Sequence, residues 1–152
     1  MAESLRPRLP YPSGFPRNEE SFKWIKGELN VAMLTPSVMY GNARGVMTPE
    51  VGVFLCGYLS RYVAQRPPNT PPLRLFSDDR LVERADTAYR DMMGGWVKEH
   101  KYAVAEVNLL TSSRLFAMAV AVGRLVVGGV LDTFHDVRAF ENALENAVRA
   151  HK

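Results

Sequence analysis

Apolar residues recur at three- and four-residue spacing along most of the chain, which is the period of an amphipathic helix. The clearest case follows Thr48-Pro49-Glu50, which offers a capping hydroxyl, a proline at the first helical position and an acid near the positive end of the helix dipole. The stripe behind this start consists of Val51, Phe54, Leu55, Tyr58, Leu59, Tyr62 and Val63. The pattern predicts a helix from Thr48 to Gln65 with this face buried.

Five further segments are predicted as helices. The first covers 19–33, where Phe22, Ile25, Leu29 and Met33 share one face. Ser77-Asp78-Asp79 supplies a cap and first-turn acids for a stripe that starts at Leu81 and ends at Gly94-Gly95. Residues 96–110 contain β-forming residues, but no turn-flanked partner strand is evident, so helix is favoured there as well. The remaining two are 115–131 and 135–150. The fold class expected from this pattern is all-α, a five- or six-helix bundle.

Two proline-rich segments interrupt the helical pattern. Residues 1–18 contain four of the ten prolines and no apolar period, so they are expected to form an extended or irregular arm. Residues 66–73 contain four prolines in close succession, which favours a stiff, polyproline-like spacer. The expected organisation is therefore an arm at 1–18 and a single helical domain at 19–152 with a spacer at 66–73.

The run 115–131 is apolar apart from a single charge, Arg124. As a helix it would be about 25 Å long, shorter than the roughly 30 Å hydrocarbon core of a membrane. A central arginine would also cost about 2.5–3.5 kcal/mol on insertion. We interpret the run as the central helix of a soluble bundle. A helix docked on a membrane or on a large hydrophobic partner is the alternative, because Gly123 and Gly128 would allow close packing.

The composition is that of one globular domain. The chain has 152 residues, of which 47% are hydrophobic and 23% charged, and its net charge of +3 permits an anionic partner without requiring one. A single cysteine, Cys56, excludes an internal disulfide framework. The basic start is not followed by the apolar run of a secretory signal, so secretion is not expected. Prolines would also break a mitochondrial presequence, although an internal import signal stays open.

The sequence contains no motif that indicates catalysis, a cofactor or a metal. There is neither a phosphate-binding glycine loop nor a spacing of His and Cys that would hold a metal. His135 lies between Asp132 and Asp136 in a pattern typical of a helix start. Cys56 is expected to be a buried, inert thiol. The acid pairs Glu19-Glu20 and Asp78-Asp79 are explained by helix starts, and a non-enzymatic protein is expected.

Basic and aromatic residues alternate in the arm and in the segment after it, as in chains that follow a phosphate backbone or a lipid surface. A solvated arm explains the same pattern equally well. The residues proposed for an interface, including the small residues around the lone arginine, are Arg6, Arg8, Tyr11, Phe15, Arg17, Trp24, Gly123, Arg124 and Gly128.

Three short stretches resemble known families, each over a tenth of the chain or less. Leu81-x-x-x-Ala85-Asp86 is similar to the short helix motif of Bcl-2 relatives, which implies a peptide-binding module. Gly123-Arg124 with Gly128 resembles the membrane helix of the small dimer-forming subunits of mitochondrial ATP synthase. Val137-Arg138-x-Phe140-Glu141 is similar to a pattern in coat proteins of rod-shaped plant viruses, which package RNA.

The function expected from these features is that of a non-catalytic accessory subunit of a large assembly. The arm, the spacer and the surplus of apolar helix surface favour a mitochondrial inner-membrane complex of the respiratory or ATP synthase type. The expected partners are other subunits, with membrane-surface or lipid contact as a further prediction. A helical RNA-packaging coat protein and a Bcl-2-like module are the alternatives, and nucleic acid is a partner only for the coat protein.

Overall fold

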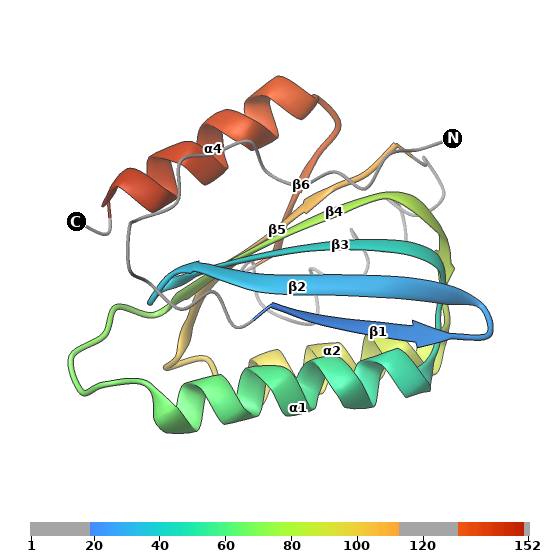
Figure 1. Cartoon of the computed structure of the whole chain (residues 1–152), viewed down its shortest axis with the longest axis horizontal. Coiled ribbons are helices and arrows are strands. Elements are labelled where there is room, and N and C mark those ends of the chain that lie inside the picture. Colours follow the sequence, from blue (N-terminus) through green and yellow to red (C-terminus); the bar gives the residue numbers. More distant parts are fainter. Residues whose placement is uncertain (1–18, 113–130, 151–152) are drawn as a thin grey trace.

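The chain forms a mixed six-stranded sheet with helices on both faces (Figure 1), and the expected all-α bundle is wrong. The computed structural model describes residues 19–112 and 131–150. The elements in these ranges are β1 (Glu20–Trp24), β2 (Gly27–Thr35), β3 (Val38–Met47), α1 (Pro49–Gln65), β4 (Leu73–Ala85), α2 (Thr87–Glu99), β5 (Val104–Leu110), β6 (Leu131–Phe134) and α4 (Val137–Ala150).

The strands lie in the sheet in the order in which they occur in the chain, from β1 to β6. The first three form an antiparallel meander, and β3, β4, β5 and β6 run parallel to one another. Parallel neighbours require a crossover connection, which α1 provides between β3 and β4 and α2 between β4 and β5. The carboxyl ends of the four parallel strands consequently point toward one edge of the sheet.

Each face of the sheet is packed against helices. Helices α1 and α2 lie side by side under one face, and α4 covers β5 and β6 on the other (Figure 1). The core beneath α1 and α2 includes Leu29, Val31 and Met33 from alternate positions of β2. The smaller core beneath α4 is built around Phe76 and Phe140. On the α4 side, Leu34 near the end of β2 belongs to this core, whereas β1 and the first half of β2 carry polar residues.

The predicted helix at 19–33 is a β-hairpin. Its apolar residues also fit a period of two, with Phe22 and Trp24 in β1 and the alternate residues of β2 on one face. Ile25, which the helical stripe required to be buried, lies at the hairpin tip and is 99% exposed. Strand pairing therefore decides between two periods that the short segment satisfies almost equally.

The predicted helix at 77–93 is wrong in its boundaries, and the predicted helix at 96–110 is wrong because Val104–Leu110 is strand β5. Residues 77–85 belong to β4, because this segment pairs with β3 on one side and, up to Asp78, with β5 on the other. Helix α2 begins only at Thr87, continues through Gly94-Gly95 and ends at Glu99. Trp96 and Val97 are buried in that helix, and their burial offsets the low helix propensity of the two glycines.

The predicted helices at 48–65 and 135–150 are confirmed as α1 and α4. In α1 the predicted face is turned to the core, with Val51, Tyr58 and Leu59 buried. Thr48 occupies the N-cap position with extended backbone, but its hydroxyl forms no capping hydrogen bond. The Pro49 start and the apolar stripe are therefore the features that define this helix.

The proline-rich segment at 66–73 contains a turn rather than an extended strut. The backbone N–H and the hydroxyl of Thr70 both donate to the carbonyl oxygen of Pro67, and Asn69 has a φ of 68°. The arm at 1–18 and most of the predicted helix at 115–131, including Arg124, lie outside the described residues. Among the residues that are described, no helix is long and apolar enough to cross a membrane.

The tip of the first hairpin is held against β3. The backbone N–H of Val46 donates to the carbonyl oxygen of Lys26 at 3.0 Å, and the indole N–H of Trp24 donates to the carbonyl oxygen of Val46 at 3.0 Å. Gly45 has a φ of 90°, and a Cβ at this position would collide with the Lys26 carbonyl oxygen. Glycine is therefore required where the hairpin tip approaches β3.

Candidate functional site

Polar side chains gather where β5 and β6 end. The last residue of β5, Leu110, lies opposite Asp78, so the remainder of β4 extends beyond its neighbour. Thr111 and Ser112 follow β5, and His135 follows β6. Thr111 and Ser112, together with the charged segment of β4, form the polar cluster, which we define as Ser77, Asp78, Asp79, Arg80, Thr111 and Ser112. In open α/β sheets this carboxyl edge is the usual place for a functional site.

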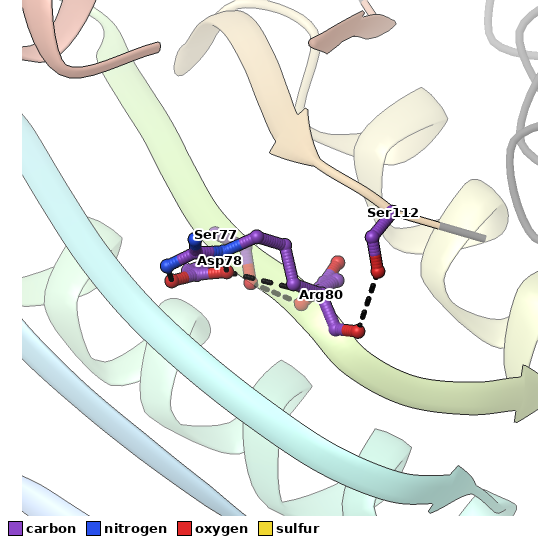
Figure 2. Close-up of polar contacts among 5 residues, drawn as sticks. Ser77, Asp78, Arg80 and Ser112 are labelled. Carbon is purple, nitrogen blue, oxygen red and sulfur yellow. Dashed lines mark hydrogen bonds and ion pairs between the residues drawn. The ribbon is translucent and has the colours of Figure 1, made fainter. Parts of the chain in front are cut away.

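An ion pair within one strand organises the cluster (Figure 2). Arg80 donates from Nε to Oδ1 of Asp78 at 3.0 Å and from a terminal nitrogen to Oδ2 at 2.9 Å. The Asp78 side chain is buried, and its hydrogen bond with Arg80 raises the pKa of the guanidinium. Ser112 donates its hydroxyl to the Arg80 carbonyl oxygen at 2.9 Å, which connects β4 to the residues after β5.

A β-bulge lies beside two neighbouring acids of β4 that are on opposite faces of the sheet. Asn42 of β3 lies opposite Asp78, whereas Arg44 lies opposite Leu81, so β4 contains one extra residue at Asp79–Arg80. Asp78 is on the α4 side, and Asp79 is on the side of α1 and α2, where its charge contributes to the raised pKa of the Tyr89 phenol. The alternation of side chains along the strand thus separates two carboxyl groups that are adjacent in the chain, and the bulge begins at the second of them.

Asp79 is a buried carboxyl group with one strong hydrogen-bond partner. Ser77 donates its hydroxyl to Oδ1 of Asp79 at 2.7 Å. Burial raises the pKa of Asp79 to about 7, the hydrogen bond from Ser77 opposes this shift, and the charge of Asp78 adds to it. This carboxyl group consequently changes its protonation near neutral pH.

A row of polar side chains connects the cluster to the far edge of the sheet. Ser21, Asn30, Asn42 and Asp78 are opposite one another on β1, β2, β3 and β4. Ser21 donates to Oδ1 of Asn30 at 2.5 Å, and Asn30 donates to Oδ1 of Asn42 at 3.0 Å. This polar row lies on the side opposite to α1 and α2, beside the smaller apolar core beneath α4.

The described residues that the sequence suggested for an interface or a site do not lie together in the structure. Among the described residues of the predicted interface set is Trp24, which stacks on Phe22 at 5.8 Å in β1. His135 is exposed, with Nδ1 3.5 Å from the Thr111 hydroxyl, and Asp136 caps α4 by accepting the backbone N–H of Arg138. Cys56 is half-buried, and its thiol contacts the Met93 sulfur at 3.6 Å. Arg6, Arg8, Tyr11, Phe15, Arg17, Gly123, Arg124 and Gly128 lie outside the described residues.

Sequence reasoning misassigned the acids of the cluster and overlooked Arg80. Asp78-Asp79 and Glu19-Glu20 were interpreted as helix starts, but both pairs are in or next to strands. The alternation of Ser21, Lys23, Glu28 and Asn30 with apolar residues was the signal for a sheet with one polar face. Within residues 19–112 and 131–150, no group of three or more His, Cys, Asp or Glu side chains is arranged to hold a metal ion.

Comparison with known proteins identifies the fold. No protein-family model and no curated protein matches the sequence. The chain is similar to an uncharacterised protein of the DUF3478 family with a SpoIIAA-like fold from Shewanella loihica PV-4, with a TM-score of 0.55 and 15% identity over 89% of this chain and 99% of that one. It is also similar to the anti-sigma factor antagonist SpoIIAA in its unphosphorylated form, with a TM-score of 0.57 and 11% identity over 76% of this chain and 95% of that one.

These likenesses show a SpoIIAA-like α/β fold and correct the functional expectation. The predicted mitochondrial accessory subunit rests on the arm, the spacer and a surplus of apolar helix surface, and the α/β sheet with its SpoIIAA-like neighbours replaces the expected helix surface. The Bcl-2 and coat-protein alternatives required helical bundles, and the Bcl-2-like stretch at Leu81–Asp86 is mainly the end of β4. All three assignments are therefore wrong.

Proposed function

We propose that this chain is a regulatory domain that acts by binding a partner protein and not by catalysing a reaction. The fold supports the proposal, since one structural neighbour is an anti-sigma factor antagonist, a protein named for its opposition to another regulatory protein. The observation that carries the proposal is the exposure of an apolar side chain, Leu81, beside the polar cluster at the edge of this sheet.

The chemistry of the polar cluster favours binding. A general base must have a lone pair within hydrogen-bond reach of a substrate. In the cluster, Arg80 engages both carboxylate oxygens of Asp78, and Ser77 engages the buried Asp79. These groups satisfy one another and fix the shape of the bulge, which is how polar networks make a surface rigid.

The bulge presents a surface suited to a protein partner. The Leu81 side chain is 40% exposed, and it lies between Arg80 and the buried Val82 in the chain. Glu83 and Arg84, which follow it, are exposed as well. An apolar centre with a charged rim is the usual composition of a protein–protein interface. We name this surface, made of Leu81, Glu83 and Arg84, the bulge surface.

Site-specific photo-crosslinking tests the proposal. A photoreactive amino acid is placed at Leu81 in the full chain, expressed in its native cells, and crosslinked proteins are identified by mass spectrometry. Tyr102 is the matched control, because it is 69% exposed and lies just before β5, where the parallel strands begin. We expect one protein to be crosslinked from position 81 and not from position 102.

The identified partner is then bound to purified chain by calorimetry. Leu81→Asp is expected to weaken binding at least tenfold, since a charge would replace the apolar centre, and Tyr102→Asp is expected to bind like wild type. Crosslinking from position 102 alone, or equal affinity of both variants, would remove the bulge surface from the interface. A chain that turns over a small molecule without any protein partner would overturn the proposal as a whole.

A further inference from the structure

Among residues 19–112 and 131–150, no strand pairs with the outer edge of β1. Within the described residues β1 is the first strand of the sheet, and its other side pairs with β2. The hairpin turn at Ile25-Lys26 closes on the Trp24–Gly27 pair, and hydrogen-bonded and non-hydrogen-bonded pairs alternate from there. Glu20, Phe22 and Trp24 thus direct their backbone groups to β2, whereas those of Ser21 and Lys23 point to the open edge.

One face of this edge is aromatic. Phe22 stacks on Phe54 of α1 with 4.9 Å between ring centroids and on Trp24 with 5.8 Å. The three rings are half-buried against the main core, so each keeps some exposed apolar surface. The opposite face of β1 carries Ser21 and Lys23. An added strand would therefore meet apolar contacts on one side and polar contacts on the other.

We infer that β1 pairs with β1 of a second copy of this chain, antiparallel and about a twofold axis through Phe22, to form one continuous sheet. In this register all five residues of β1 overlap. The outward backbone groups of Ser21 meet those of Lys23 in the partner copy, and those of Lys23 meet those of Ser21. A twofold contact uses the same patch of both copies, so the patch must complement itself.

The side chains are self-complementary in this register. Phe22 lies opposite Phe22 of the second copy at a non-hydrogen-bonded position, where side chains approach most closely. The stack with Phe54 would then extend across the axis as four rings. On the other face, Lys23 is opposite Ser21 of the second copy and diagonal to both Glu19 and Lys23 of that copy, so the two lysines are not directly opposite each other.

The charge on Lys23 disfavours one alternative register. A lysine on an edge strand discourages indiscriminate pairing. Shifting the pairing toward Trp24 would place the two Lys23 side chains directly opposite each other, and like charges at that position are destabilising. Pairing in the Phe22-centred register is therefore favoured over the register in which the two Lys23 side chains are directly opposite each other. This surface is separate from the bulge surface, which lies on β4, so the inference goes beyond the proposed function.

A proline at position 23 tests the inference. Lys23→Pro removes an outward backbone N–H without removing a hydrogen bond between β1 and β2. Lys23→Ala is the matched control, because it removes the same side chain and keeps the N–H. By analytical ultracentrifugation we expect wild type and Lys23→Ala to reach twice the 17.0 kDa chain mass and Lys23→Pro to dimerise at least tenfold more weakly. Monomeric wild type at several hundred micromolar, or a Lys23→Pro dimer of unchanged affinity, would overturn the inference.

A second measurement covers the case in which Lys23→Pro does not fold. In a Cys56→Ser background, a spin label at Lys23→Cys should give an inter-copy distance below about 25 Å in pulsed electron resonance, since the two labelled positions are diagonal across one strand pair. Labels at Tyr102→Cys should be about 40 Å apart or more, because β5 lies four strands from the edge. A dimer with the short distance at position 102 and the long one at position 23 would show that another surface forms the contact.

Discussion

Arg80 binds both carboxylate oxygens of Asp78, its neighbour two residues earlier in the same strand. Two residues apart in a regular strand, both side chains would stand on one face and point in parallel. Here the bulge at Asp79–Arg80 bends the strand locally, and the guanidinium turns back onto the carboxylate. The backbone N–H of Arg80 also donates to Oδ1 of Asp78 at 3.2 Å, so the buried Asp78 charge is compensated by its neighbour at the start of the bulge.

Removing Arg80 should be more harmful than removing both partners. Arg80→Met leaves the buried Asp78 carboxylate without its counter-charge and is expected to lower the free energy of unfolding by about 3 kcal/mol. The double variant Asp78→Asn with Arg80→Met is expected to lose less, because no charge is left buried. Urea denaturation of the three proteins measures both effects, and a double variant less stable than Arg80→Met would contradict the argument.

Asp79→Asn should change how stability depends on pH. The pKa of Asp79 in the folded chain is about 7, above the ordinary carboxyl value near 4, so the folded state retains this proton more strongly than the unfolded chain does. The corresponding stability is present below about pH 4 and is lost as the pH rises to about 7. We expect Asp79→Asn to be more stable than wild type at pH 8, with the difference shrinking toward pH 4. Thermal denaturation across this range measures it, with exposed Glu83→Gln as the control for the loss of one negative charge.

Two glycine substitutions should have opposite effects. Gly45→Ala forces a side chain into a left-handed backbone region and against the Lys26 carbonyl oxygen, so a loss of about 2 kcal/mol or more is expected. Gly57 lies in α1, and a Cβ there meets no atom within 4 Å. Gly57→Ala is expected to stabilise the protein by up to about 1 kcal/mol. Equal effects of the two substitutions in urea denaturation would be incompatible with this packing of the hairpin tip.

Phe140→Ala should loosen the attachment of α4. Phe140 is buried, and its ring meets those of Phe76 and Phe134 edge-on at 5.7 and 5.8 Å. Truncation is expected to cost about 3–5 kcal/mol, and hydrogen exchange should rise in α4 more than in α1. Tyr102→Ala, at an exposed position, is the control and should be close to neutral.

The helices that the sequence predicts correctly are the ones whose signals are local. Helix α1 has Pro49 at its start and one uninterrupted apolar stripe, and α4 has its stripe of Phe140, Leu144 and Ala147. The proline start and the apolar stripes can be recognised from residues within one helix, without knowing what the helix packs against. The strands depend on partners far away in the chain, and β5 was misassigned for this reason, since its neighbours β4 and β6 were themselves not recognised.

The polar cluster could not be assembled from the sequence alone. Asp78-Asp79 before an apolar stripe is a common helix start, and only the pairing of β4 with β3 shows that these acids belong to a bulged strand. Arg80 gains its role from the same bulge, and Ser112 from the end of β5. The alternating polar residues of β1 and β2 were visible in the sequence, but a helical period explained part of the same segment and concealed them.

The strand order has a consequence for how the protein is made. Because each strand pairs with the strand that precedes it in the chain, β1, β2 and β3 can pair once they have left the ribosome, before the later strands emerge. Each later crossover then adds one strand to a sheet that is already formed, and no gap has to be held open for a strand still to be synthesised. The sheet can thus grow by one strand at a time during synthesis, in the order in which the strands occur in the chain.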